Sequence, residues 1–429
     1  MVSPIRSRLK QSIAAGTLAL AALTLSQTSP DLRFVPAAFA LSQDVSIDNL
    51  SFTKDKAKIT IKSAVFQGTN LSKEEITKLL TGAASGDEAK ALLAKLSASK
   101  VSIPEVVVTA DKATATARGF AMSEVNAGKA ASVALAGVDV VGQTDKGDPV
   151  NVKGGTLAIA DVDFGVLLDM ATGEFGKGAF RYSKFDWAGA EATFADPETP
   201  KSAAGGNLVK IKIGQFYGAN TYDGDVFKQG DAVLKSSTVE LPKASKAAAA
   251  LAAFGYDKVE FSFTTQGDYN QTNKKLNLND YTVSSAGAGA IGLKAQMGNI
   301  EKAALMGGDP AKTLAAYSAG DVSGFSLRYA NTGLFEKAVA FLAAQEKKKP
   351  EQLKQEWSGQ AQAIIPAIMG GDPAGKKLAD AIAAFIANPK SLTISAKAKA
   401  GSIPFKDFIA MKNPLELLPK IDLTAVANQ

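Results

Sequence analysis

The alternation of apolar and polar positions is clearest at residues 246–300, where it predicts a helix followed by three strands. An alanine-rich run favours the helix, and Gly255 is a typical residue to follow its last turn. The next residues alternate as a strand with one apolar face, and the polar run 270–275 predicts a turn into a return strand. We therefore predict an antiparallel strand meander over residues 258–297.

One face of this meander is the candidate binding surface. Large apolar side chains alternate with small or polar residues on three successive strands, so they are expected to share a face of the sheet. The residues expected to contact a hydrophobic ligand are Phe261, Phe263, Leu276, Leu278, Ile291 and Leu293. No residue is expected to be catalytic, to bind a cofactor or to hold a metal.

Residues 41–200 predict a β-rich N-terminal half with short helices. Ser72 and Ser85 each stand three residues before a glutamate, which is the spacing of a capping box at a helix start. Alternating runs predict strands over residues 101–108, 113–120, 131–141 and 156–163, then a short helix over 164–170 and an aromatic strand over 180–187.

Residues 207–429 predict an α+β C-terminal half, in which helices over 333–388 and closing strands over 391–427 follow the meander. The pair Asp372-Pro373 is typical of the N-cap and first position of a helix. A stripe through Leu353, Trp357 and Ile364 marks an amphipathic helix, and such stripes face the core more often than a membrane or partner. A Pro/Gly-rich run at 196–206 predicts a linker between the halves.

The two halves share a short stretch of sequence. Residues 61–70 align without gaps with residues 211–220 and share an Ile-Lys pair, a Phe, a Gly and an Asn. This similarity indicates either a duplicated module or a chance match between two strand-turn segments. The expected fold class is α+β, with mainly antiparallel β-sheets packed with amphipathic helices. If the similarity reflects a duplicated module, the chain consists of two duplicated halves.

The N-terminal segment has the features of an export signal. Arg6, Arg8 and Lys10 precede an apolar run over residues 13–25, and Ala38-Phe39-Ala40 forms an A-x-A cleavage box. The apolar run is short for a bilayer span, so we expect a cleavable signal peptide over residues 1–40 and a periplasmic protein. An uncleaved membrane anchor is the alternative, because the cleavage box lies far from the apolar run. After cleavage, we expect peripheral membrane contact or none.

Charge gives no reason to expect a nucleic-acid partner. The chain has 48 basic and 42 acidic residues, and loss of residues 1–40 lowers its net charge from +6 to +3. The arginines that remain, Arg118, Arg181 and Arg328, are far apart in the sequence. Recognition of phosphates and bases depends heavily on arginine, so nucleic acid is excluded as an expected partner.

The chain contains no histidine and no cysteine among its 429 residues. Disulfides, Ser-His-Asp or Cys-His catalysis and histidine-bearing zinc sites are therefore excluded. Carboxylates, lysine, hydroxyl groups and tyrosine remain as possible reactive groups.

Two glycine-rich segments imitate nucleotide-binding motifs. Residues 287–292 match G-x-G-x-x-G, but the following residues alternate as a strand, whereas the dinucleotide motif opens a helix. Residues 370–377 resemble a phosphate-binding loop, yet Lys377 stands where a Ser or Thr must bind magnesium. We interpret the first segment as a turn and the second as a helix start.

Two other patterns imitate catalytic sites. Ser97 and Ser51 each precede a lysine by three residues, but the partner motifs of Ser-Lys enzymes are absent from the sequence. Asp161 and Asp163 are predicted on one face of a strand, and paired carboxylates can bind calcium or hydrolyse glycosides. The acidic pair therefore supports an alternative function, a carboxylate-dependent hydrolase that acts on envelope glycan.

The segment after the alanine-rich helix resembles the repeating pattern of AsmA-like exported envelope proteins of Gram-negative bacteria. The resemblance rests on the helix end at Phe254-Gly255-Tyr256-Asp257, the paired amphipathic strands and the glycine-rich entry to the last strand of residues 256–300. This chain departs from that pattern in its short length, its many helices and its signal of cleavable type. The resemblance implies an apolar surface that serves envelope lipids.

The residues and the resemblance together predict a non-catalytic periplasmic or cell-envelope protein. We expect it to bind a hydrophobic ligand, such as a lipid, or an envelope protein partner through its amphipathic sheets. The glycan hydrolase and a purely structural component of envelope assembly are the alternatives.

Overall fold

The computed structural model describes residues 42–54, 56–84, 86–145, 147–163, 181–202, 206–224, 226–305, 310–411 and 413–429. Strands make up 52% of the structure and helices 25%, and the strands pair antiparallel, so the α+β class is confirmed. The chain divides into two compact units. Unit 1 comprises residues 1–197, 208–219 and 307–310, and unit 2 comprises residues 198–207, 220–306 and 311–429.

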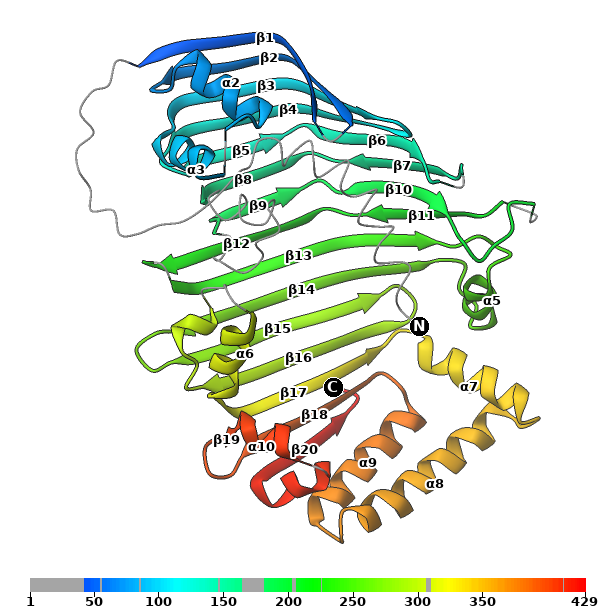
Figure 1. Ribbon diagram of the computed structural model, residues 1–429. Helices are drawn as coiled ribbons and strands as arrows, with labels where there is room; N and C mark the ends of the chain where they lie inside the picture. The colour runs from blue at the N-terminus through cyan, green and yellow to red at the C-terminus, as the bar shows by residue number, and fades with distance from the viewer. Residues whose placement is uncertain are drawn as a thin grey trace. The chain divides into compact units, whose positions relative to one another are not determined.

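Unit 1 begins with four long strands that pair in chain order (Figure 1). These strands are β1 (Gln43–Lys54), β2 (Ala57–Thr69), β3 (Ser97–Ala110) and β4 (Ala113–Asn126). Between β2 and β3, the helices α2 (Lys73–Thr81) and α3 (Gly86–Lys95) lie over one face of the sheet (Figure 1). Their apolar side chains join those of the strands in one buried core, so this face of the sheet is sealed from water.

The capping box predicted at Ser72 is confirmed. The Ser72 hydroxyl accepts a hydrogen bond from the backbone N–H of Glu75 at 3.2 Å, and the Glu75 carboxylate accepts one from the Ser72 N–H at 2.7 Å. Both donors would otherwise lack a partner at the start of α2. The second predicted box includes Ser85, which lies outside the described residues, although α3 does begin at Gly86.

The later strands of unit 1 are interrupted at their middle. Residues 129–143 form one long strand that breaks at Ala136 into β5 (Lys129–Leu135) and β6 (Gly137–Gln143), and β4 pairs with both. The same break separates β7 (Pro149–Gly154) from β8 (Leu157–Asp163), β9 (Lys184–Trp187) from β10 (Ala190–Ala195), and β11 (Leu208–Ile213) from β12 (Phe216–Asp223). On one side of the break, the strands pair in the order β6, β7, β10 and β11. On the other side, they pair in the order β5, β8, β9 and β12. We call this line of breaks the crease.

Small residues form the crease because neighbouring backbones approach closely there. The Gly155 N–H donates to the Gly189 carbonyl, and Gly189 has a φ of 94°. A Cβ atom on Gly189 would meet the carbonyl oxygen of Ile213 at 2.3 Å. Glycine is therefore required at residue 189 for both conformation and space.

Two expectations about the division of the chain can be compared with the structure. Residues 196–207 connect β10 to β11, which pair directly, so the predicted linker joins neighbouring strands within a sheet. The two units divide inside β12 instead. Residues 61–70 lie almost entirely in the unbroken β2, whereas residues 211–220 cross the crease between β11 and β12, so duplication is not shown. The helix predicted at 164–170 lies outside the described residues.

Unit 2 contains an antiparallel sheet whose strands again pair in chain order. Its members are β13 (Val226–Glu240), β14 (Val259–Asn270), β15 (Lys275–Ser285), β16 (Gly289–Gly298), β17 (Asp321–Asn331), β18 (Ser391–Ala398) and β20 (Ile421–Ala427). The meander predicted over residues 258–297 is present as β14, β15 and β16. The sequence did not predict β17, which extends the same sheet.

Helices border the sheet of unit 2. Helix α5 (Lys246–Ala253) precedes β14, and α6 (Pro310–Ser318) precedes β17. Between β17 and β18 the chain forms α7 (Leu334–Gln345), α8 (Pro350–Ile368) and α9 (Pro373–Ala387). The closing segment adds β19 (Ile403–Pro404), α10 (Phe405–Ala410) and a 3-10 helix (Pro414–Lys420). Asp372 caps α9 through the N–H of Ala374, which explains the Asp372-Pro373 pair.

Candidate functional site

Strands β14 to β17 place their charged residues on only one face of the sheet. Residues that are register partners share a face, and successive residues alternate between faces. Phe263 pairs with Val283, Val283 with Ile291, and Ile291 with Tyr329, so these four side chains share one face. The same register assigns the charged residues of these strands to the other face: Glu260, Asp268, Lys275, Asp280, Lys294, Asp321 and Arg328.

The uncharged face remains largely open to solvent at its centre. The exposed fraction is 55% for Ile291, 44% for Leu327, 42% for Tyr281 and 40% for Val283. Large apolar residues that remain exposed side by side on a regular sheet mark a contact surface more often than scattered ones do. We call this surface the open apolar face, with the residues Phe261, Phe263, Leu278, Tyr281, Val283, Ile291, Leu293, Phe325 and Leu327.

One border of the open apolar face is a small buried cluster beneath α6. Tyr269 and Ile300 are buried there, and Leu276 and Met297 pack against them together with Tyr317 of α6. The Tyr269 hydroxyl donates to the Ile300 carbonyl at 2.8 Å. Burial raises the pKa of Tyr269, and the negative charge of Glu301 adds to this rise.

The opposite border is formed by aromatic contacts with α9. The ring of Tyr329 lies 5.8 Å from that of Phe385, which in turn lies 5.2 Å from the ring of Phe335 at the start of α7. The Tyr329 hydroxyl hydrogen-bonds to the Ala288 carbonyl and to the Asn331 side chain. These contacts anchor α9 beside the sheet and leave the centre of the face uncovered.

The six residues predicted from the sequence lie on this one face. Five belong to the open apolar face, whereas Leu276 belongs to the cluster at its border. Four residues of this face were not predicted from the sequence: Tyr281, Val283, Phe325 and Leu327. The alternation of Phe325, Leu327 and Tyr329 with Ser326 and Arg328 could have identified β17 as a fourth strand. Ligand binding by these residues stays a prediction.

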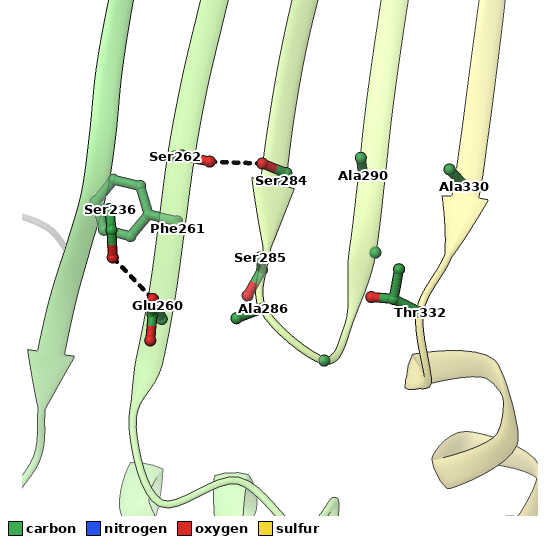
Figure 2. A pocket seen from close by; sticks show the side chains of 12 residues that line it. Ser236, Glu260, Phe261, Ser262, Ser284, Ser285, Ala286, Ala290, Ala330 and Thr332 are labelled. Atoms are coloured by element: carbon green, nitrogen blue, oxygen red, sulfur yellow. Dashed lines mark hydrogen bonds between the residues drawn. The ribbon is translucent and has the colours of Figure 1, made fainter.

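A shallow depression of about 400 Å³ lies at one end of strands β14 to β17 (Figure 2). Ser262 and Ser284 share a hydrogen bond of 2.6 Å there, and the Ser236 hydroxyl donates to Glu260 at 2.8 Å (Figure 2). Its other lining residues are mostly small, and its one carboxylate is already paired with Ser236 and Lys258. The serine hydroxyls and the carboxylate named here are therefore already hydrogen-bonded within the protein.

The glycine-rich motifs are explained by local structure. Gly287, in the turn after β15, and Gly289, the first residue of β16, have φ values of 69° and 139°, so residues 287–292 lead into a strand. Residues 370–377 follow α8 and start α9, and no strand precedes them. Neither segment has the strand-turn-helix geometry that a phosphate-binding loop requires.

The Ser-Lys pairs lack the helical spacing of Ser-Lys enzymes, and the acidic pair takes part in local contacts. Ser97 and Lys100 both lie in β3, and Ser51 lies in β1, so neither serine stands one helical turn from its lysine. Asp161 accepts a hydrogen bond from the Ser183 hydroxyl, and Asp163 forms a β-bridge with Arg181. Within the described residues, no group of three acidic side chains could hold a metal ion.

Comparison with known proteins gives one match. A family model described as "Uncharacterized protein" matches residues 282–428, which extend from the second half of β15 to β20. No curated protein matches the sequence. In the part of the chain that the structure describes, none of the helices combines the length and apolar character needed to cross a bilayer.

Proposed function

We propose that this chain is a non-catalytic, exported protein of the cell envelope that binds lipid acyl chains on the open apolar face. The strict separation of charged and apolar residues on β14 to β17 is the observation that carries the proposal. The N-terminal sequence pattern supports the periplasm as its location.

The energetics favour an apolar ligand. Covering a fully exposed Ile or Leu side chain contributes roughly 1.5–3 kcal/mol, so covering the half-exposed Ile291 and Leu327 contributes about half as much at each residue. Several such contacts offset the entropy lost when a flexible chain is immobilised. A charged or strongly polar ligand would lose hydration on this face without a charged partner in return.

Mass spectrometry of solvent extracts tests the proposal. Protein purified from its native envelope is expected to release acyl lipid, and delipidated protein is expected to bind a fluorescent acyl probe. Repeated absence of lipid from the extracts, together with absence of probe binding, would contradict the proposal. That outcome would favour a purely structural role in envelope assembly, because the two functions differ only in the ligand.

The alternative of a glycan hydrolase has less support. It depends on Asp161 and Asp163, but Asp161 already accepts a hydrogen bond from Ser183, and the backbone of Asp163 pairs with that of Arg181. Replacing both aspartates by asparagine is expected to leave lipid binding unchanged.

A further inference from the structure

The open apolar face carries one pair of hydroxyl groups near its centre. Thr265 on β14 is the register partner of Tyr281 on β15, so the two side chains lie next to each other. The ring of Tyr281 packs edge-on against Phe263, with 5.1 Å between the ring centroids. This packing fixes the orientation of the Tyr281 ring on the face that also carries Thr265.

The two hydroxyls differ from their neighbours in hydrogen bonding. Neither the Thr265 nor the Tyr281 hydroxyl has a hydrogen-bond partner among the described residues. The tyrosines at the borders of the face, Tyr269 and Tyr329, both donate to backbone carbonyls. On the opposite face, the adjacent Thr264 hydroxyl donates to Asp280 at 2.6 Å. The pair therefore provides two free donors within an apolar surface.

We propose that Thr265 and Tyr281 bind the carbonyl oxygen of a neutral, ester-linked acyl lipid. This inference rests on the proposed lipid-binding function and specifies the lipid class. An ester carbonyl accepts hydrogen bonds from hydroxyls and carries no net charge. An ionised fatty acid would place its carboxylate on a face to which β14 to β17 contribute no cation, so the loss of hydration is not compensated.

The position of the pair also directs the acyl chain. Beyond Tyr281, the register partners Leu293 and Leu327 continue the apolar surface across β16 and β17. Neighbouring strands are about 4.8 Å apart, so β15 to β17 provide an apolar path of roughly 10 Å across the strands. With the ester at the hydroxyl pair, the chain lies across these strands toward Leu327.

The test compares three probes of equal chain length: a fatty acid methyl ester, the ionised fatty acid and the alkane. Their dissociation constants are measured by displacement of a fluorescent acyl probe from the parent protein and from the double variant Thr265→Val, Tyr281→Phe. Both substitutions keep the side-chain shape and remove a hydroxyl. Thr393→Val, on the opposite face of β18, is the matched control.

The double variant is expected to bind the ester about tenfold more weakly, with alkane binding within about twofold of the parent, because two donors to the carbonyl are lost. The control is expected to bind all three probes as the parent does. Unchanged ester binding by the double variant, or tighter binding of the ionised acid by the parent, overturns this inference and leaves lipid binding intact. Failure of the parent to bind any of the probes removes both proposals.

Discussion

Val283 on β15 and Ile291 on β16 are register partners on an apolar sheet face, yet 40% and 55% of these residues remain open to solvent. The comparable pair in unit 1, Phe66 and Val101, is fully covered. Helices α2 and α3 supply the apolar side chains that cover the face in unit 1. The same strand pattern therefore builds a sealed core in one unit and an open surface in the other.

A charge at Ile291 is expected to abolish lipid binding without unfolding the protein. Ile291→Asp should weaken binding of a fluorescent acyl probe at least about tenfold, because the carboxylate would be desolvated beneath the chain. The free energy of unfolding should fall by only about 1 kcal/mol, since Ile291 is already exposed. Lys294→Asp introduces the same residue on the other face of β16 and should bind as the parent does. Equal binding by both variants would contradict the assigned surface.

Helix α8 offers a test of which part of its apolar stripe belongs to the core. Leu353 is buried against α7, whereas half of Ile364 is exposed. Leu353→Ala is expected to lower the free energy of unfolding by about 2–5 kcal/mol, and Ile364→Ala by less than about 1 kcal/mol. Denaturant unfolding measures both values. Similar losses for the two variants would show that Ile364 is covered in solution.

The geometry of the crease predicts that replacing Gly189 by alanine strongly lowers the stability of the protein. An alanine there combines a positive φ with a clash against the Ile213 carbonyl, whereas Gly147→Ala has a positive φ and open space around its Cβ. Gly147→Ala should therefore cost about 1–2 kcal/mol of stability, from backbone conformation alone. Gly189→Ala should cost clearly more, as measured by thermal or urea unfolding. Equal losses would mean that the crease relaxes to accommodate the methyl group.

The capping box of α2 predicts a pH dependence of stability. The hydrogen bond from the Ser72 N–H, followed by that from Lys95, lowers the pKa of Glu75 below its ordinary value of 4.5. Glu75 therefore stabilises the folded state above that value, and its contribution is lost as the pH falls through the lowered pKa. The parent should lose more stability than Glu75→Gln between about pH 6 and pH 3, because the amide still accepts the cap hydrogen bond but does not titrate.

Urea midpoints across that pH range measure this difference. Glu74→Gln is the matched control, because Glu74 lies in the same helical turn and forms an exposed ion pair with Lys78. It should keep the pH dependence of the parent. Parallel pH profiles for the parent and Glu75→Gln would show that the cap carboxylate does not contribute.

Local pattern predicted the strands well where the alternation was unbroken. The meander of β14 to β16 follows directly from residues such as Phe261 and Phe263. Strand β13 was missed because a register shift between Leu234 and Ser237 interrupts its alternation. The run at 196–206 indicated a connection correctly, but Pro and Gly mark a turn between paired strands as readily as a domain boundary.

Local pattern could not predict which apolar faces are covered. Ile59 and Ile291 both occupy apolar positions of alternating strands, yet Ile59 is buried and Ile291 is exposed. The difference arises from helices that pack on one sheet and leave the centre of the other uncovered, so periodicity identifies the face and tertiary packing decides its exposure. The pairing of Thr265 with Tyr281 could not be predicted either, because it depends on the register between β14 and β15.

The separation of charge from apolar side chains on β14 to β17 makes strand length critical. Inserting a single residue just before Ile291 in β16 would move every later side chain to the other side of the sheet, so Lys294 would enter the apolar face and Ile291 and Leu293 would leave it. Inserting two residues would restore the arrangement. Natural variants of this chain should therefore gain or lose residues in these strands in pairs, or accommodate a single one as a bulge, while the connecting turns vary freely in length.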